Sequence, residues 1–244
     1  MNTPIHKNLS RREQEAYKAR LHRLTKRELE ILTGMVLGDA HIEARGHGAR
    51  LHIRQGGNQA FFVDHLFEVF RRWTWMDQPT TYSYRSHRYR EEGTLLHQVH
   101  FKTFNHPVFQ ALHGVFYRPK AGGGYQKVVP PAIEDWLTPR VLAYHIMCDG
   151  SMDQRSLRIA THDLSPSDCQ AYVRAINARF GLHGEVRPHR IRRVERVYPF
   201  LWFPVRDQPT IKARLRRYML PGFASKIGIK ARGEWFRWEF THDG

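Results

Sequence analysis

The sequence predicts an α+β fold made of two similar halves, each in the order helix, two strands, helix, two strands, helix. Two observations lead to this prediction. Residues 32–40, LTGMVLGDA, and residues 142–150, LAYHIMCDG, are short apolar runs that end in an aspartate followed by a small residue. Similar helix and strand patterns then follow each run. The aspartates, Asp39 and Asp149, are 149 − 39 = 110 residues apart, a period too long for a solenoid.

In the first half, two Ser/Thr-x-x-Glu capping patterns predict helix starts at Ser10 and at Thr25. The first begins a polar, basic helix to Leu21, and the second begins the helix that carries the first apolar run to Asp39. Two strands are then expected over residues 41–43 and 50–54, followed by an amphipathic helix over 59–73. A hairpin over 80–84 and 95–103 and a last helix over 104–116 complete this half.

A glycine-rich break at residues 119–124 predicts a linker between the halves. Thr138 and Pro139 then predict the start of the helix that ends at Asp149. The later segments are a strand over 154–160, a helix over 166–180 closed by Gly181, strands over 183–187 and 197–205, and a helix over 208–219 that Pro221 stops. The predicted division is a basic N-terminal extension (1–24), a first half (25–116), a linker (117–137), a second half (138–227) and a C-terminal tail (228–244).

The charge of the chain indicates a polyanionic partner. Lys and Arg number 39 against 23 Asp and Glu, which gives a net charge of +16 and a pI near 10.3. Aromatic residues are interleaved with the basic ones and no amphipathic lipid-binding stretch stands out, so nucleic acid is favoured over a membrane surface. Ribosomal proteins share this balance, so charge alone does not identify a function.

Several classes of protein are disfavoured. Two cysteines, Cys148 and Cys169, do not make a disulfide framework, and a reducing compartment is expected. Cysteines and histidines between residues 145 and 183 do not follow the usual paired-ligand spacing of zinc sites. No apolar run reaches the length needed to span a bilayer, so a soluble protein is expected, and residues 1–24 lack the apolar core of a secretory signal.

The two apolar helices offer surfaces for close packing against each other. Gly34 and Gly38 permit close backbone approach in the first helix, and Ala143 is the expected small counterpart in the second. Such packing would bring Asp39 and Asp149 together. Two adjacent carboxylates repel unless one is protonated or a hard divalent cation lies between them. In a basic protein at pH 7 this predicts Mg²⁺ and the cleavage of phosphodiester bonds.

Two lysines occupy corresponding ends of the halves. Lys127 follows the glycine-rich linker and Lys226 follows the last predicted helix. A lysine near the acids could polarise the attacked phosphate or the water, although a solvated lysine or one that contacts a DNA phosphate is the ordinary alternative. The matched positions favour a catalytic role.

Residues 10–230 resemble the LAGLIDADG homing endonucleases, in particular the single-chain type with two motifs. Besides the two apolar runs, the matching segments are Tyr17-Lys18, Leu37-Gly38-Asp39-Ala40, Asp64-His65, Phe104 with His106, Leu137-Thr138-Pro139, Leu142-Ala143-Tyr144 and Asp149-Gly150. One such motif is degenerate, but two at this spacing, each followed by a lysine, are specific. The second motif departs from the pattern, with Tyr144 at the family's glycine and Cys148 at its small or acidic position.

The resemblance implies two αββαββα halves whose antiparallel four-stranded sheets form a saddle over DNA. It places the acidic metal ligands at Asp39 and Asp149, with assistance from the carbonyl groups of Gly38 and Cys148, and the active-site lysines at Lys127 and Lys226. Mg²⁺ is the expected ion, and Ca²⁺ or Mn²⁺ could substitute.

Arginines on or between the expected strands are candidates for DNA contact, because arginine binds both guanine edges and phosphates. For each of them a solvated side chain is the alternative. They are Arg45, Arg50, Arg54, Arg85, Arg88, Arg90, Arg155, Arg158, Arg187, Arg190, Arg192 and Arg193. His52, Gln55 and His100 are undecided.

Together these observations predict a monomeric, Mg²⁺-dependent endonuclease that cuts both strands of a long asymmetric DNA site and is encoded by a mobile intron. Two alternatives remain: an RNA maturase that assists splicing of a group I intron, and a catalytically inactive DNA-binding regulator. Both alternatives tolerate loss of the acids, whereas both acids are present. The family implies an organelle, a mitochondrion rather than a chloroplast.

Overall fold

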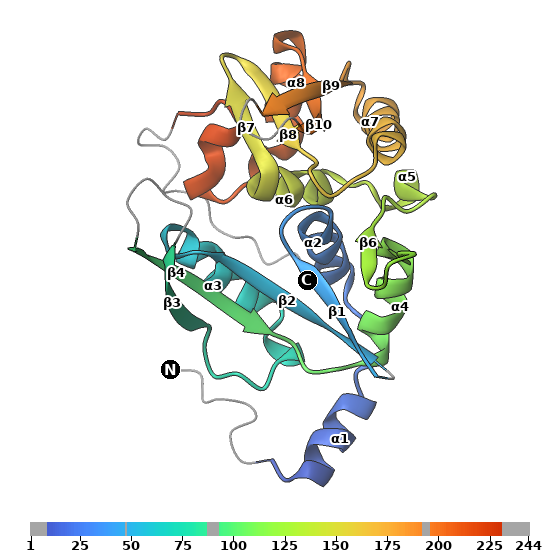
Figure 1. Ribbon diagram of the computed structural model, residues 1–244, viewed down its shortest axis with the longest axis vertical. Coiled ribbons are helices and arrows are strands. Elements are labelled where there is room, and N and C mark those ends of the chain that lie inside the picture. Colours follow the sequence, from blue (N-terminus) through green and yellow to red (C-terminus); the bar gives the residue numbers. More distant parts are fainter. Residues whose placement is uncertain (1–8, 47, 87–92, 192–195, 231–244) are drawn as a thin grey trace. The chain divides into compact units, whose positions relative to one another are not determined.

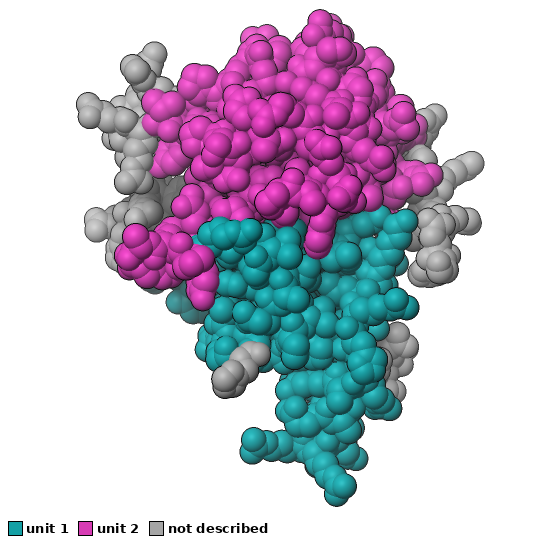
Figure 2. All heavy atoms as spheres, turned by 90° about the vertical axis from the view of Figure 1, so that its right-hand side faces the viewer, with its two compact units in different colours: residues 1–32, 39–118 teal, residues 33–38, 119–244 magenta. Residues whose placement is uncertain are grey.

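The computed structural model describes residues 9–46, 48–86, 93–191 and 196–230 (Figure 1). It divides into two compact units, unit 1 with residues 1–32 and 39–118, and unit 2 with residues 33–38 and 119–244 (Figure 2). Each unit contains a four-stranded antiparallel sheet, in the order β1-β2-β4-β3 and β7-β8-β10-β9. This repeated strand order confirms the predicted α+β architecture of two similar halves.

Unit 1 begins with two capped helices. Ser10 and Glu13 form the predicted capping box of the first helix, and Thr25 and Glu28 exchange the equivalent hydrogen bonds at the second. The elements are α1 (Arg11–Ala19), α2 (Lys26–Leu37), β1 (His41–Arg45), β2 (Gly48–Gly56), α3 (Ala60–Val69), β3 (Thr80–Ser86), β4 (Thr94–Lys102) and α4 (Pro107–Phe116), with 3₁₀ helices at Gly57–Gln59 and Arg71–Trp73. Residues 33–37 of α2 are grouped with unit 2.

One face of the first sheet is apolar and packs on helices α3 and α4, as Figure 1 shows for α3. Leu51, Ile53 and Phe101 on the strands are fully buried, and the ring of Phe101 lies edge-on to Phe67 of α3 at 5.4 Å between centroids. Because side chains alternate along a strand, the residues between them lie on the opposite, polar face.

Unit 2 has the same plan. Its elements are α5 (Ile133–Trp136), α6 (Pro139–Asp149), β7 (Gly150–Asp153), β8 (Ser156–Ala160), α7 (Pro166–Phe180), β9 (Glu185–Ile191), β10 (Arg196–Phe203) and α8 (Gln208–Leu215), followed by 3₁₀ helices at Arg216–Tyr218 and Pro221–Ile227. Strands β5 (Tyr117–Pro119) and β6 (Tyr125–Lys127) precede them, and a 3₁₀ helix at Val205–Asp207 precedes α8. Leu157, Ile159 and Leu201 are buried on the face toward α7, with Tyr172 and Ile176 of that helix.

Two local predictions were wrong in detail. Of the segment 154–160, expected as one strand, only Ser156–Ala160 is strand β8, because Gln154 adopts a left-handed conformation at φ 56° and forms the turn that leads from β7 into it. Pro188, expected in a connection, lies inside β9 opposite Pro199. The helix predicted to stop before Pro221 does end before it, since α8 ends at Leu215 and the 3₁₀ helix that follows ends at Tyr218. Pro221 also begins a further 3₁₀ helix, which buries Phe223 and Ile227 and carries Lys226.

Of the helices that the structure describes, none combines the length and the apolar character required to cross a bilayer.

Candidate active site and polar sheet faces

The two apolar runs pack closely at residues that are equivalent in the motifs. A Cβ atom added at Gly34 would lie 2.8 Å from the Cβ of Tyr144, and one added at Gly38 would lie 2.5 Å from the Cβ of Cys148. Each pair is offset by 110 residues, as the two aspartates are. Ala143 was expected as the small counterpart. That expectation was wrong, because Tyr144 and Cys148 face the glycines, and the missing side chains of Gly34 and Gly38 make room for them.

Asp39 lies outside the helix that leads to it. Helix α2 ends at Leu37, and Gly38 and Asp39 form a turn, so the carboxylate is not a member of the last helical turn with its negative dipole end. The side chain is exposed, and Gln55 Nε2 of β2 donates a hydrogen bond of 2.8 Å to Asp39 Oδ2. Asp39 and Gln55 line a pocket of about 310 Å³ in unit 1, together with His41, His52, Arg54, Gly56 and Gln98.

Asp149 is the last residue of α6, and its side chain is 25% exposed. Its Oδ2 lies 3.6 Å from Nε2 of His145, a fully buried residue whose Nδ1 is 2.9 Å from the hydroxyl of Tyr172. Burial, and then the charge of Asp149, raise the pKa of Tyr172, so its hydroxyl is protonated at neutral pH. Gly150 has to be small, because a Cβ there would lie 2.6 Å from the carbonyl oxygen of Ile146.

Each candidate lysine reaches the carbonyl group that directly precedes a motif aspartate. Lys127 Nζ donates to Gly38 O at 2.5 Å. Lys226 Nζ donates to Cys148 O at 2.8 Å and to Met147 O at 2.7 Å. Both lysines, placed at corresponding chain positions in the sequence, therefore end at corresponding positions of the motifs.

Each motif offers one carboxylate, Asp39 in unit 1 and Asp149 in unit 2. Mg²⁺ usually takes one or two carboxylate oxygens from a protein, together with substrate phosphates. Among the described residues, no group of three or more His, Cys, Asp and Glu side chains forms a metal-binding cluster. The carbonyl groups of Gly38 and Cys148 already accept hydrogen bonds from the lysines, so either could serve as a ligand only through its second lone pair.

The candidate arginines of unit 1 are divided between the two faces of the sheet. Arg45, Arg50 and Arg54 alternate with the buried residues of β1 and β2 and lie on the polar face. Arg85 is opposite Leu95 of β4, which lies on the same face of that strand as the buried Val99. Arg85 therefore belongs to the other, apolar face, where it donates to Gly93 O. Arg88 and Arg90 lie outside the described residues.

In unit 2, two candidate arginines stack on aromatic rings of the polar face. The guanidinium carbon of Arg158 is 4.0 Å from the ring centre of Phe200, and that of Arg187 is 3.4 Å from the ring centre of Trp202. Arg155 is exposed in the turn between β7 and β8, and Arg190 lies in β9 opposite Val197. Arg192 and Arg193 fall outside the part of the chain that the structure describes.

Some polar-face residues were missed in the sequence. Tyr82 and Tyr84 of β3 stack with ring centroids 6.0 Å apart, and Gln98 and Lys102 of β4 share their face by register. Strict alternation along β3 and β4 was the signal that could have found them. The candidates from the sequence were arginines, with His52, Gln55 and His100 undecided, so neither these four residues nor the acid Glu43 were among them.

Comparison with known proteins places these features in a family. Residues 29–206, more than two thirds of the chain, match the model of the LAGLIDADG DNA endonuclease family. The solved structure of the homing endonuclease I-WcaI bound to its DNA recognition sequence superposes with a TM-score of 0.79 at 21% identity, over 91% of this chain and 95% of that one. The fold is therefore shared.

Curated relatives are distant in sequence. Cytochrome b mRNA maturase bI2 of Saccharomyces cerevisiae is 23% identical over 82% of this chain, and the match spans 47% of the length of that relative, about half. Probable intron-encoded endonuclease 1 of Wickerhamomyces canadensis is 22% identical over 86% of this chain and 88% of its own length.

Proposed function

The chain belongs to the LAGLIDADG DNA endonuclease family, and from that premise we propose that it is a site-specific homing endonuclease that hydrolyses phosphodiester bonds in both strands of DNA with a divalent metal ion. Mg²⁺ is the proposed ion, with Ca²⁺ or Mn²⁺ as substitutes in the site. The proposed target is long and asymmetric, because two unequal halves in one monomeric chain suit a non-palindromic sequence. The proposed biological role is the mobility of an intron.

The observation that carries this proposal is the pair of lysine contacts. Each motif aspartate directly follows a carbonyl group to which a lysine donates, Lys127 at Gly38 and Lys226 at Cys148. At the end of each motif, the ammonium group of a lysine thus contacts the residue that directly precedes the aspartate. Two such pairs correspond to the two strands that a double-strand endonuclease must cut.

The residues divide the chemistry in a simple way. Asp39 and Asp149 would each serve as a ligand of divalent metal, which when bound supplies the positive charge that stabilises the attacking and leaving oxygens. Gln55, which donates to Asp39 Oδ2, and His145, whose Nε2 faces Asp149 Oδ2, would orient the two carboxylates. Lys127 and Lys226 would lower the energy of the negatively charged transition state or orient the attacking water.

Basic residues on the polar sheet faces would supply the DNA contacts. Arg45, Arg50 and Arg54 in unit 1, and Arg158 and Arg187 in unit 2, are the described arginines on these faces. Stacking on Phe200 and Trp202 limits the motion of Arg158 and Arg187, which reduces the entropy lost when they bind. The remaining candidates, Arg85, Arg88, Arg90, Arg155, Arg190, Arg192 and Arg193, would then contribute mainly through their charge.

The test is cleavage of a plasmid that carries the joined exons flanking the intron of this gene. Asp39→Asn and Asp149→Asn should each abolish Mg²⁺-dependent double-strand cleavage while DNA binding in a gel-shift assay survives. Asp163→Asn, an exposed acid outside both motifs, is the matched control and should cut normally. Cleavage that persists in both motif variants would overturn the active-site assignment.

An RNA maturase is the competing proposal, because relatives from two yeasts carry that name. It is less favoured, since both motif acids and both lysines are present, and RNA binding does not require them. Stimulated splicing of the host intron by a protein that never cuts the joined exons would favour it. We place the protein in an organelle, a mitochondrion rather than a chloroplast, since those relatives are named for cytochrome b mRNA.

A further inference from the structure

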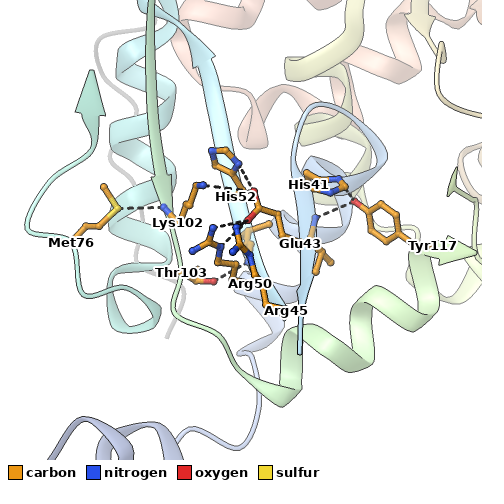
Figure 3. A network of polar contacts seen from close by, with 11 residues as sticks. His41, Glu43, Arg45, Arg50, His52, Met76, Lys102, Thr103 and Tyr117 are labelled. Carbon is orange, nitrogen blue, oxygen red and sulfur yellow. Dashed lines mark hydrogen bonds and ion pairs between the residues drawn. The ribbon is translucent and has the colours of Figure 1, made fainter. Parts of the chain in front are cut away.

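One carboxylate, Glu43, lies among basic side chains on the polar face of the unit 1 sheet (Figure 3). In the strand register Glu43 of β1 is opposite Arg50 of β2, and His52 of β2 is opposite Lys102 of β4. The four residues therefore share one face of three neighbouring strands. On the other face of the same strands are the buried apolar residues.

The contacts to Glu43 use both of its oxygens. Arg50 Nε donates to Oε2 at 2.8 Å, Arg50 Nη2 forms an ion pair with the same oxygen at 2.8 Å, and Arg45 Nη2 is 3.5 Å from it. His52 Nδ1 is 3.0 Å from Oε1, and Lys102 Nζ is 3.7 Å from it. The side chains of Glu43 and Arg50 are only 20% and 24% exposed, so salt screens this pair less than it screens an ordinary surface pair.

The protonation states in the cluster follow from the same geometry. Burial by itself would raise the pKa of Glu43, but the hydrogen bond and the charge of Arg50, with Lys102 and His52, outweigh it and lower the pKa to about 2. Burial, then Lys102, lower the pKa of His52 to about 4. At neutral pH Glu43 is therefore charged and His52 is neutral, and because a carboxylate only accepts, His52 Nδ1–H donates a hydrogen bond to Glu43. One negative charge faces three positive ones.

A carboxylate in this place is unfavourable for binding a polyanion through charge alone, because it cancels part of the attraction to phosphates. It has a compensating effect on Arg50. A guanidinium group has five N–H donors in a fixed plane, so the hydrogen bond from Nε and the ion pair of Nη2 with Glu43 fix the direction in which the remaining donors point. An arginine fixed in this way is suited to bidentate recognition of a guanine edge.

We propose that Glu43 is a specificity-determining residue of the DNA-binding surface: it orients Arg50 toward a base edge and suppresses attraction to DNA of any sequence. The proposal rests on the proposed function, since it presupposes DNA binding by this sheet. Specificity is a difference between two affinities, and Glu43 acts on both of them. The ordinary alternative is that Glu43 and Arg50 form a cross-strand pair that only stabilises the β1–β2 hairpin.

The experiment selects binding sites from a pool of randomised double-stranded DNA, without divalent metal so that nothing is cut. Affinities for the selected site and for random DNA are then measured at several salt concentrations. Glu43→Gln should bind random DNA more tightly than the wild type, with a salt slope steeper by about 0.9 for one added phosphate contact. The ratio of specific to random affinity should fall about tenfold, the effect of one lost bidentate contact.

Glu185→Gln is the matched control. Glu185 of β9 accepts from Arg187 Nε at 2.5 Å, but this pair is largely exposed, at 54% and 42%, and Arg187 is held independently by Trp202. The control makes the same change in net charge. It should raise both affinities together and leave their ratio unchanged.

Arg50→Lys keeps the charge but loses the planar fork. Arg50→Lys should lower the ratio of specific to random affinity without changing the salt slope. If thermal melting shows that Glu43→Gln is unfolded, the Arg50→Lys result tests the proposal in its place. A wild-type ratio in Arg50→Lys, or a wild-type ratio and slope in folded Glu43→Gln, would overturn the role of Glu43. If the wild-type protein enriches no DNA sequence at all, the proposed function fails together with the role of Glu43. Enrichment by the wild type with an unchanged ratio in the variants would overturn the role of Glu43 alone.

Discussion

Lys127 donates a hydrogen bond of 2.5 Å to the carbonyl oxygen of Gly38, 89 residues away in the chain. Only 9% of Lys127 is exposed, so its ammonium group needs a polar partner, and this carbonyl provides one. Lys226 makes the equivalent contact with Cys148. The two lysines come from different elements, strand β6 and a 3₁₀ helix. What the two lysines share is therefore the group that they contact, the carbonyl directly before a motif aspartate.

We predict that Lys127→Met lowers the single-turnover rate of DNA cleavage by about 10²-fold, the usual effect of losing one preorganised electrostatic contact. Methionine retains the apolar stem, so affinity for the target should change by no more than about threefold. Rapid-quench kinetics and gel shifts would measure the two quantities. Lys120→Met, at an exposed position before Gly124, is the control. A normal rate in Lys127→Met would mean that this lysine only closes the helix end.

The glycines of the first motif make a second prediction. Gly34→Ala should lower the free energy of unfolding by about 1–3 kcal/mol, because the added Cβ would overlap the carbonyl oxygen of Val141 and lie 2.8 Å from the Cβ of Tyr144. Gly114→Ala in α4 is the matched control. Nothing lies within 4 Å of a Cβ there, so alanine should stabilise the helix by up to about 1 kcal/mol. Urea unfolding measures both, and equal effects would contradict the packing described.

Local patterns in the sequence predicted most of the elements. The capping boxes at Ser10 and Thr25, the Thr138 cap and the Gly181 terminator are all present. Each depends on residues within four positions of one another, and such signals can be recognised from the sequence. The equivalence of the two aspartates was recognisable for a different reason, because the same short pattern recurs 110 residues later in the chain.

Contacts between distant segments were not predictable in this way. Gln55 reaches Asp39 across 16 residues and Tyr172 reaches His145 across 27, and in neither pair does a local pattern mark the partner. Glu43 was overlooked for a related reason. In an isolated sequence a single acid beside arginines resembles a solvated charge, and only the strand register shows that Arg50, His52 and Lys102 converge on it.

A third prediction concerns Glu28, a carboxylate that is 5% exposed. It accepts from Arg72 Nη2 at 2.6 Å and from Trp73 Nε1 at 3.1 Å, besides capping α2 at Thr25. Glu28→Ala should cost about 2–4 kcal/mol of unfolding free energy, because it removes a cap and leaves buried donors unsatisfied. Glu68→Ala, at an exposed position of α3, should change stability by less than about 0.5 kcal/mol. A small effect of Glu28→Ala in chemical denaturation would show that water replaces the carboxylate.

The last prediction is a loss of stability in mild acid. Burial, and then the charge of Arg27, lower the pKa of His65 to about 4, and burial lowers that of His52 to about 4. An unfolded histidine titrates near 6.5. Between pH 6.5 and 4 the unfolded chain therefore binds more protons than the folded one, so the free energy of unfolding falls as the pH falls through this window.

We expect His65 to contribute on the order of 2 kcal/mol to this fall, after allowance for solvent screening. Urea unfolding at pH 7, 5.5 and 4.5 measures it, and His65→Asn, which does not titrate in this range, should show a smaller decrease. Glu43 acts in a separate window, because its lowered pKa removes stability only between about pH 4.5 and 2. A wild-type free energy that stays constant from pH 6.5 to 4.5 would mean that His65 is hydrated in the folded protein.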